Sequence, residues 1–405
     1  MFRKSYLSIY VMLRPSLLIV SLLTALLTAC SSGHTALKRG NFDLAVQRAS
    51  KRLQQGAGIT KRGHALAPLV LKQAFTQAYE RHQTTIRRLS SPANTDAFRW
   101  EAVHREYEQL QKLTDDARLG ITKQCAACSE WLATYPSSYQ DRQRETRELA
   151  AADRYEAAEQ AFTYREENRL AAKDAFLNYK KADQWVTGFR QAQAKAAEAL
   201  SYATLRVVIE PLGPTREISP NDNQELQAMI LRQISPNEAP STFVRLYRPD
   251  ENAGEGWPIH QAVQMQVIDY TPYNENVSSS NTTVYSNQAY KVGEKKINDS
   301  TKVDILEKVK GTLTTYRREI TAGLSLRMRA LDTETGKTLW EDSVWESRNW
   351  ATEWQTFDGD SRALNGQSLK SADPFSPSRW SLYSSMRDEL ASDVVRRIRT
   401  KYASD

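Results

Sequence analysis

The sequence predicts an α+β protein, in which an all-α helical array comes first and a layer of helices on a mostly antiparallel sheet follows. Residues 36–200 are rich in Ala, Gln, Glu, Arg and Lys, which are strong helix formers, and hold few prolines. From Thr204 onward, short β-branched runs alternate with turn residues, which indicates strands. A last segment of helical periodicity closes the chain and is expected to cover the sheet.

Residues 1–29 have the layout of a secretory signal. Arg3, Lys4 and Arg14 supply positive charge, and the apolar run Leu17–Leu27 follows them. This run has 11 residues, whereas a membrane-spanning helix needs about 20. We therefore expect the segment to be removed and not to remain as an anchor.

Leu27, Thr28, Ala29 and Cys30 end this segment. They resemble the lipobox of bacterial lipoproteins. The resemblance implies cleavage before Cys30, a diacylglyceryl group on its thiol, and a further acyl chain such as palmitate on its amino group. Several chains hold a protein stably on a membrane, whereas one holds it only marginally. Ser31 follows where an inner-membrane retention signal has Asp, so by analogy the protein is sorted to the outer membrane. We expect it to face the periplasm there. The alternative is an ordinary secretory signal with an unrelated cysteine.

The composition of the remaining 376 residues limits the function classes. Residues 30–405 contain 52 Lys and Arg and 48 Asp and Glu, compared with 55 and 48 in the whole chain. This near balance gives no reason to predict binding to nucleic acid. The length suits two or three domains. Besides Cys30 only two cysteines remain, too few for a disulfide framework.

The helical half follows a short tether, residues 30–35, and spans residues 36–200. Segments around Phe42, Trp100 and Tyr155 share an aromatic residue, an acid, and then small or aliphatic residues, which we expect to open amphipathic helices. This pattern resembles the second helix of tetratricopeptide repeats, and the resemblance implies a surface that binds another protein. The alternative is a plain antiparallel helical array.

Cys125 and Cys128 form a C-x-x-C pair where the helical pattern stops. Such a pair is typical of a thioredoxin-type redox centre or of half a metal site. No strand is predicted before it and no second cysteine pair exists, so a local disulfide or two packed thiols is the favoured interpretation. Pro136–Ser138 then breaks the helical pattern and is expected to separate two helical hairpins.

The α+β half spans residues 201–405. Strands are predicted at Leu205–Ile209, at Phe243–Tyr247 and around Val263–Val267, and a helix capped by Asn221 or Asp222 at 221–234. The Asn-, Ser- and Thr-rich residues 271–302 lack periodicity, so we expect a long polar loop or a ribbon extension.

Strand-like residues at 309–320 come next. Leu324, Leu326 and Met328 then alternate with Ser325, Arg327 and Arg329, which predicts a strand with one apolar and one basic face. The turn Thr335–Lys337 makes this strand a hairpin with residues 338–345. Apolar residues from Leu382 to Ile398 share one face of the final helix.

Four tryptophans crowd the end of this hairpin: Trp340, Trp345, Trp350 and Trp354. They form either an aromatic face for a glycan or a partner, or a core and rim of large side chains. The second interpretation is favoured because strands accept aromatic residues readily.

The opening strand Leu205–Glu210, the turn Leu331–Lys337 and the helix Ser385–Arg399 together carry a weak resemblance. They resemble the periplasmic domain shared by the curli-secretion channel lipoprotein and the penicillin-binding-protein activator lipoproteins. The resemblance covers about half of the chain and implies an α+β layer. It does not extend to the helical half, so neither pore formation nor synthase activation is carried over.

No catalytic residue, metal-ligand set or cofactor is predicted. The five histidines lack the H-E-x-x-H spacing, and no G-x-S-x-G elbow or dinucleotide-binding loop occurs. A hydrolase is the least favoured hypothesis. It stays open because the paired acids of a glycosidase come together only in the fold and leave no motif in the sequence. We expect a non-enzymatic lipoprotein that acts as a scaffold or accessory in envelope assembly or secretion through a protein partner. The alternative is a peptidoglycan- or glycan-binding lipoprotein.

Overall fold

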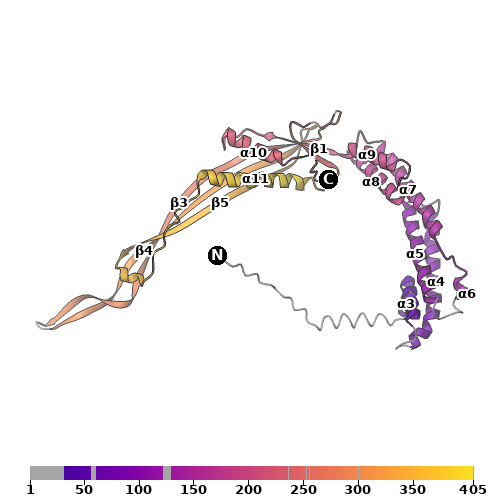
Figure 1. Ribbon diagram of the computed structural model, residues 1–405, viewed down its shortest axis with the longest axis horizontal. Coiled ribbons are helices and arrows are strands. Elements are labelled where there is room, and N and C mark those ends of the chain that lie inside the picture. Colours follow the sequence, from indigo (N-terminus) through magenta and orange to yellow (C-terminus); the bar gives the residue numbers. More distant parts are fainter. Residues whose placement is uncertain are drawn as a thin grey trace. The chain divides into compact units, whose positions relative to one another are not determined.

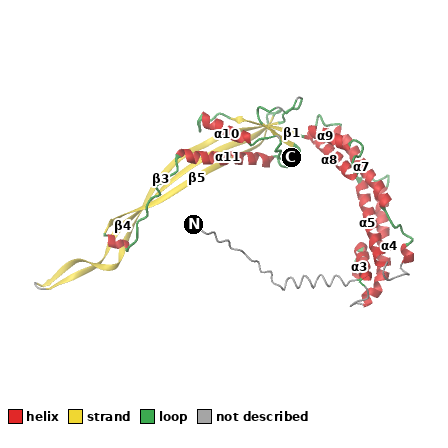
Figure 2. Ribbon diagram, viewed as in Figure 1, coloured by secondary structure: helices red, strands yellow, loops and turns green. Residues whose placement is uncertain are grey.

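The structure is a computed structural model, which describes residues 32–55, 61–121, 129–235, 237–251, 253–254, 256–298 and 301–404. The chain divides into two compact units, Met1–Ala203 and Thr204–Asp405. Within the described residues the first is helical, and the second contains a five-stranded sheet with helices (Figure 2). The predicted α+β class, with helices first and a mostly antiparallel sheet second, is confirmed.

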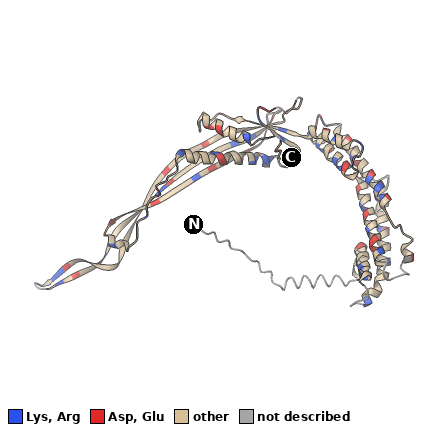
Figure 3. Ribbon diagram, viewed as in Figure 1, with Lys and Arg blue, Asp and Glu red and all other residues tan. Residues whose placement is uncertain are grey.

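The helical unit is a succession of antiparallel neighbours of unequal length. Its described helices are α2 (His34–Lys38), α3 (Phe42–Gln54), α4 (Lys61–Ser90), α5 (Arg99–Ile121), α6 (Ser129–Leu132), α7 (Gln140–Phe162), α8 (Arg169–Trp185) and α9 (Ala192–Ala203). Acidic and basic residues are interspersed along these helices (Figure 3).

Small residues let the last three helices of this unit pack closely. The interior between α7, α8 and α9 is lined by fully or nearly fully buried alanines, including Ala158, Ala175, Ala182 and Ala196. Tyr179 fills the space between them and is itself fully buried. These helices differ in length from one to the next.

Two of the three repeated sequence patterns open helices, and the third does not. Phe42 begins α3 and Arg99 begins α5, whereas Tyr155 lies in the last third of α7. The reason is that residues 140–153 contain neither glycine nor proline and are strong helix formers, so α7 begins directly after the break at Pro136–Ser138. The pattern around Tyr155 reports burial against α8 and not a helix start.

The second unit is built on one sheet of strand order β2-β1-β3-β4-β5 (Figure 1). Its elements are β1 (Leu205–Leu212), α10 (Pro220–Arg232), β2 (Val244–Tyr247), β3 (Gln261–Asn298), β4 (Thr301–Asp332), β5 (Thr338–Gly359), the 3₁₀ helix η2 (Ser361–Leu364) and α11 (Arg379–Lys401). β1 runs parallel to β2 and β3, and the remaining pairs are antiparallel. The cap of α10 is Ser219 and not Asn221 or Asp222; its hydroxyl accepts from Asp222 N at 3.1 Å.

The core of this unit lies between the sheet and α10 and α11. Leu324, Leu326 and Met328 are buried under α11, and Arg327 and Arg329 lie exposed on the opposite face, as the alternation predicts. Met386, Leu390, Val394 and Ile398 of α11 are fully buried on this side. The sheet therefore has one face covered by helices and one polar face.

Within the segment 271–302, the described residues 271–298 and 301–302 are not a loop, which corrects one of the two expectations for this segment. They belong to β3 and β4, which pair from Gln261↔Asp332 to Asn298↔Thr301. Facing residues here are mostly polar, as in Asn281↔Thr314 and Thr283↔Thr312. No hydrophobic core lies under this part of the pair, so the sequence carries no period-two apolar signal. Beyond Gly311↔Gly359, where β5 stops, β3 and β4 continue as a two-stranded ribbon (Figure 1). We call residues 289–298 and 301–310 the ribbon tip.

The segment after β5 contacts the base of the ribbon tip through hydrogen bonds and a cation–π contact. Asn365 donates from its side-chain amide to Tyr285 O at 3.0 Å, and its Oδ1 accepts from Asn287 N at 2.7 Å. Arg362 lies over the Tyr290 ring at 4.4 Å. The following residues return along β5, where Gln355 N donates to Lys370 O at 2.9 Å. This segment then leads into α11.

Candidate functional site

Several of the predicted site residues lie outside the described residues. These are the lipid-attachment residue Cys30, its neighbours Leu27, Thr28 and Ala29, and the pair Cys125 and Cys128. Acylation of Cys30 and a local disulfide therefore stay predictions. Within the described part of the chain, no helix has both the length and the apolar character that a membrane crossing requires.

The four tryptophans of β5 do not form one face. Trp340 and Trp350 are partly buried against the core under α11, and Trp354 stacks on Tyr316 with ring centroids 5.2 Å apart. Trp345 occupies an odd position of β5, whereas the other three occupy even positions, so it points to the opposite face of the sheet. It lies opposite Ser325 of β4 and is 67% exposed on the polar face. Three of the four follow the favoured core-and-rim interpretation, which leaves Trp345 as the aromatic side chain available on the polar face.

A polar cleft lies on the same face of the sheet as Trp345. Its floor is formed by Gln264 and Gln266 of β3 and by Arg327 and Arg329 of β4, with a lip at Pro211–Pro214, and its volume is about 290 Å³. Arg329 Nε donates to Gln264 Oε1 at 2.9 Å. Arg327 faces Ser343, two residues from Trp345 along β5. Diagonal neighbours of this kind are ~7–8 Å apart, within reach of long side chains.

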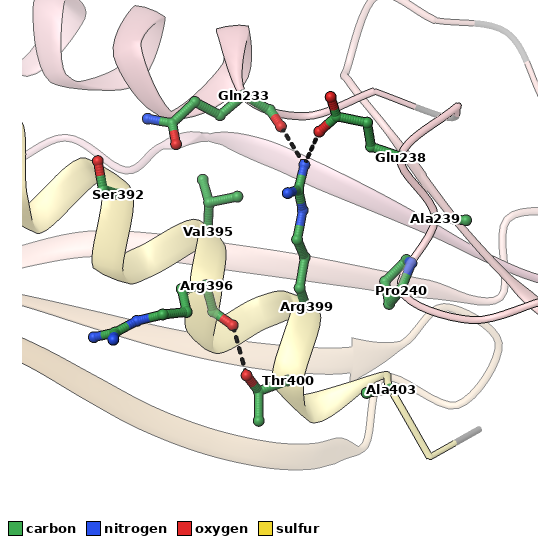
Figure 4. A pocket seen from close by; sticks show the side chains of 10 residues that line it. All are labelled: Gln233, Glu238, Ala239, Pro240, Ser392, Val395, Arg396, Arg399, Thr400 and Ala403. Carbon is green, nitrogen blue, oxygen red and sulfur yellow. Dashed lines mark hydrogen bonds and ion pairs between the residues drawn. The ribbon is translucent and has the colours of Figure 1, made fainter.

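A second depression lies between α11 and the segment that follows α10 (Figure 4). Arg399 reaches across it and donates to Gln233 O at 2.9 Å and to Glu238 Oε2. Figure 4 shows this guanidinium directed toward both partners, while Arg396 points away from them. The two contacts join the end of α11 to the end of α10, so Arg399 has a structural role here.

The helical unit has a buried charged cluster where three helices meet. His82 of α4 is 8% exposed, and its two ring nitrogens lie 2.9 Å from Asp43 Oδ1 of α3 and 2.5 Å from Glu106 Oε2 of α5. Burial opposes a charged imidazole, but the hydrogen bonds to both carboxylates outweigh it, so the pKa of His82 is raised. Hydrogen bonding to His82 lowers the pKa of Asp43. The cluster has the character of a structural clamp.

Apolar side chains lie exposed on the outer face of α8. Leu170 is 57% exposed, and Leu177, seven residues later, lies on the same face and is also exposed. Tyr164, in the turn before α8, is exposed as well. We call these three residues the α8 row. Its signal was present in the sequence as an i, i+7 leucine pair opposite the buried Ala172 and Ala175.

Among the residues that the structure describes, no group of three or more His, Cys, Asp or Glu side chains is arranged to hold a metal ion. No protein-family model and no curated protein matches this chain.

Proposed function

We propose that this chain is a non-enzymatic lipoprotein of the bacterial outer membrane, held by acylated Cys30, that acts as a scaffold or accessory in envelope assembly or secretion. Its helical unit binds a protein partner through the α8 row. The observation that carries the partner-binding part is the exposure of Leu170 and Leu177 on one face of α8. Isolated exposed leucines need no explanation, but a row on one helix face is typical of a docking surface.

The anchor is tested first. We expect Cys30→Ala to abolish labelling by a radioactive fatty acid and to move the protein from the membrane fraction to the soluble fraction. The measurement is fractionation of cells, with Cys125→Ala as the control, since that substitution removes a thiol but no lipid. Membrane attachment of the Cys30→Ala protein at the level of the control would contradict the lipoprotein assignment.

The partner surface is tested by charge insertion. We expect Leu170→Asp and Leu177→Asp, separately and together, to remove the dominant species that cross-links to the protein in native membranes. The matched control is Leu119→Asp, because Leu119 of α5 is 58% exposed in the same unit but lies outside the α8 row. Cross-linking that both proteins retain equally would exclude the row as the docking surface.

A second candidate function is glycan binding on the polar face of the sheet. One specific observation favours it: Trp345 is two-thirds exposed on the face of the sheet that also holds a cleft floored by amide and guanidinium groups. Aromatic faces stack on sugar rings, and such groups bond sugar hydroxyls. We expect Trp345→Ala to lower co-sedimentation with purified sacculi if this function holds. The substitution should change the free energy of unfolding by less than ~0.5 kcal/mol, so lost binding would not reflect unfolding. Equal sedimentation of both proteins would exclude it.

A further inference from the structure

In the ribbon tip, β3 and β4 pair as strands only with each other. Beyond Gly311↔Gly359 the register shows β4 paired only with β3. A two-stranded hairpin alone is marginally stable in water, and a sheet with apolar side chains normally buries one face. The tip nevertheless carries exposed aliphatic residues: Val292, Ile297, Val303, Ile305 and Leu306.

Strand propensity accounts for only some of these side chains. Valine and isoleucine are favoured in any strand, but Leu306 is not β-branched and is 62% exposed. Val292 and Ile297 sit at register shifts of β3, where the extra residue has no register partner on β4. The exposed aliphatic surface therefore points to something that covers it.

The charges of the tip indicate what covers it. Residues 289–310 contain six lysines and four acidic residues. Two of the acids are held within the tip: Lys291 Nζ lies 2.6 Å from both Glu294 Oε1 and Asp304 Oδ1, and Lys302 Nζ lies 3.2 Å from Glu294 Oε2. The tip thus presents an excess of lysine around aliphatic side chains.

This composition differs from that of protein interfaces. Those are enriched in Tyr, Trp and Arg and depleted in Lys, whereas residues 289–310 contain no Trp or Arg, and their one tyrosine, Tyr290, lies under Arg362. Aliphatic side chains surrounded by lysine suit the boundary between anionic headgroups and acyl chains.

We propose that the ribbon tip is a docking surface for an anionic lipid bilayer. The aliphatic side chains enter the headgroup region, and the lysines contact lipid phosphates. The depth is limited by the backbone, because unpaired strand edges do not enter the hydrocarbon core. This contact is independent of acylation at Cys30, and the two can fail separately.

The test uses a chain that begins at Ser31 and so lacks Cys30. It keeps all three hydrophobic clusters of the two units, which lie within residues 32–404. We expect it to sediment with vesicles of phosphatidylcholine mixed with phosphatidylglycerol, less with phosphatidylcholine alone, and less at high salt. Leu306→Asn should weaken binding about tenfold, and Lys308→Glu should weaken it on the anionic vesicles only.

The matched control is Val277→Asn. Val277 lies on β3 in the same strand pair, is 52% exposed and faces Arg318 of β4, outside the tip, so binding should be unchanged. Absence of sedimentation by the parent chain, or equal loss in Leu306→Asn and Val277→Asn, would overturn the proposal. So would a concentration-dependent dimer, seen by analytical ultracentrifugation without vesicles and abolished by Leu306→Asn, which would assign the tip to a second copy.

Discussion

Tyr179→Ala is expected to destabilise the helical unit by ~3–5 kcal/mol. Tyr179 is fully buried, and its ring meets those of Tyr155 and Phe162 edge to face, with centroids 5.3 Å and 6.0 Å away. The alanines around it have no longer side chain with which to fill the space, so a cavity would remain. The measurement is urea unfolding, with hydrogen exchange of the α7–α9 amides to localise the loss.

Two further variants divide this effect into its parts. Tyr179→Phe keeps the ring and removes only the hydroxyl, which donates to Glu159 Oε1 at 2.8 Å, so we expect a loss of ~1–2 kcal/mol. Tyr164→Ala removes an exposed ring from the same unit and should cost less than ~0.5 kcal/mol. If Tyr179→Ala behaved like Tyr164→Ala, the packing of α7, α8 and α9 described above would be wrong.

Removal of the imidazole in His82→Ala is expected to cost ~1–3 kcal/mol near neutral pH. The substitution leaves the carboxylates of Asp43 and Glu106 without their shared donor. Both carboxylates are partly exposed, at 44% and 25%, so water replaces part of what is lost and the figure lies below that of a fully buried ion pair. The measurement is again urea unfolding, with exchange followed in α3, α4 and α5.

The same cluster predicts a pH dependence of the wild-type protein. The pKa of His82 is raised in the folded state, so its stabilisation is complete below the unfolded pKa of ~6.5 and is lost as the pH rises through the higher folded value. The pKa of Asp43 is lowered, so its contribution is lost only in acid. As the pH rises from about 5 to about 9, the free energy of unfolding of the wild type should therefore fall relative to that of His82→Ala. A constant difference over this range would exclude a charged His82.

Segments with a core beneath them were predictable, and segments without one were not. The alternation Leu324–Arg329 and the spacing along α11 follow from burial on one face, which produces a periodic pattern of apolar residues in the sequence. The ribbon formed by β3 and β4 has no such pattern, because its pairs are held by backbone hydrogen bonds between polar residues. The place of β1 between β2 and β3 depends on contacts distant in the chain, which local patterns do not encode.

The same distinction applies to the candidate sites. That Trp345 lies opposite to Trp340, Trp350 and Trp354 follows from odd and even positions on one strand, so the sequence held this signal. Exposure of Leu306 was not predictable, because it depends on where β5 stops. The clamp at His82 brings together residues 39 and 24 positions apart, a separation at which no sequence motif indicates a contact.

The irregularities of the long strand pair have a consequence for how its length can change. The register shifts between Val267/Asp269, Thr271/Asn274, Tyr285/Ala289, Lys291/Gly293 and Lys296/Asn298 all place the extra residues on β3 and none on β4. β3 is therefore the strand in which insertions are already accommodated. Loss of one residue at a shift, such as Val292, can be absorbed locally with the facing residues preserved. Loss of one residue from β4 would turn every later side chain of that strand to the other face. Natural or engineered changes of length are thus expected to be tolerated in β3 at its register shifts and to disrupt the pairing when they occur in β4.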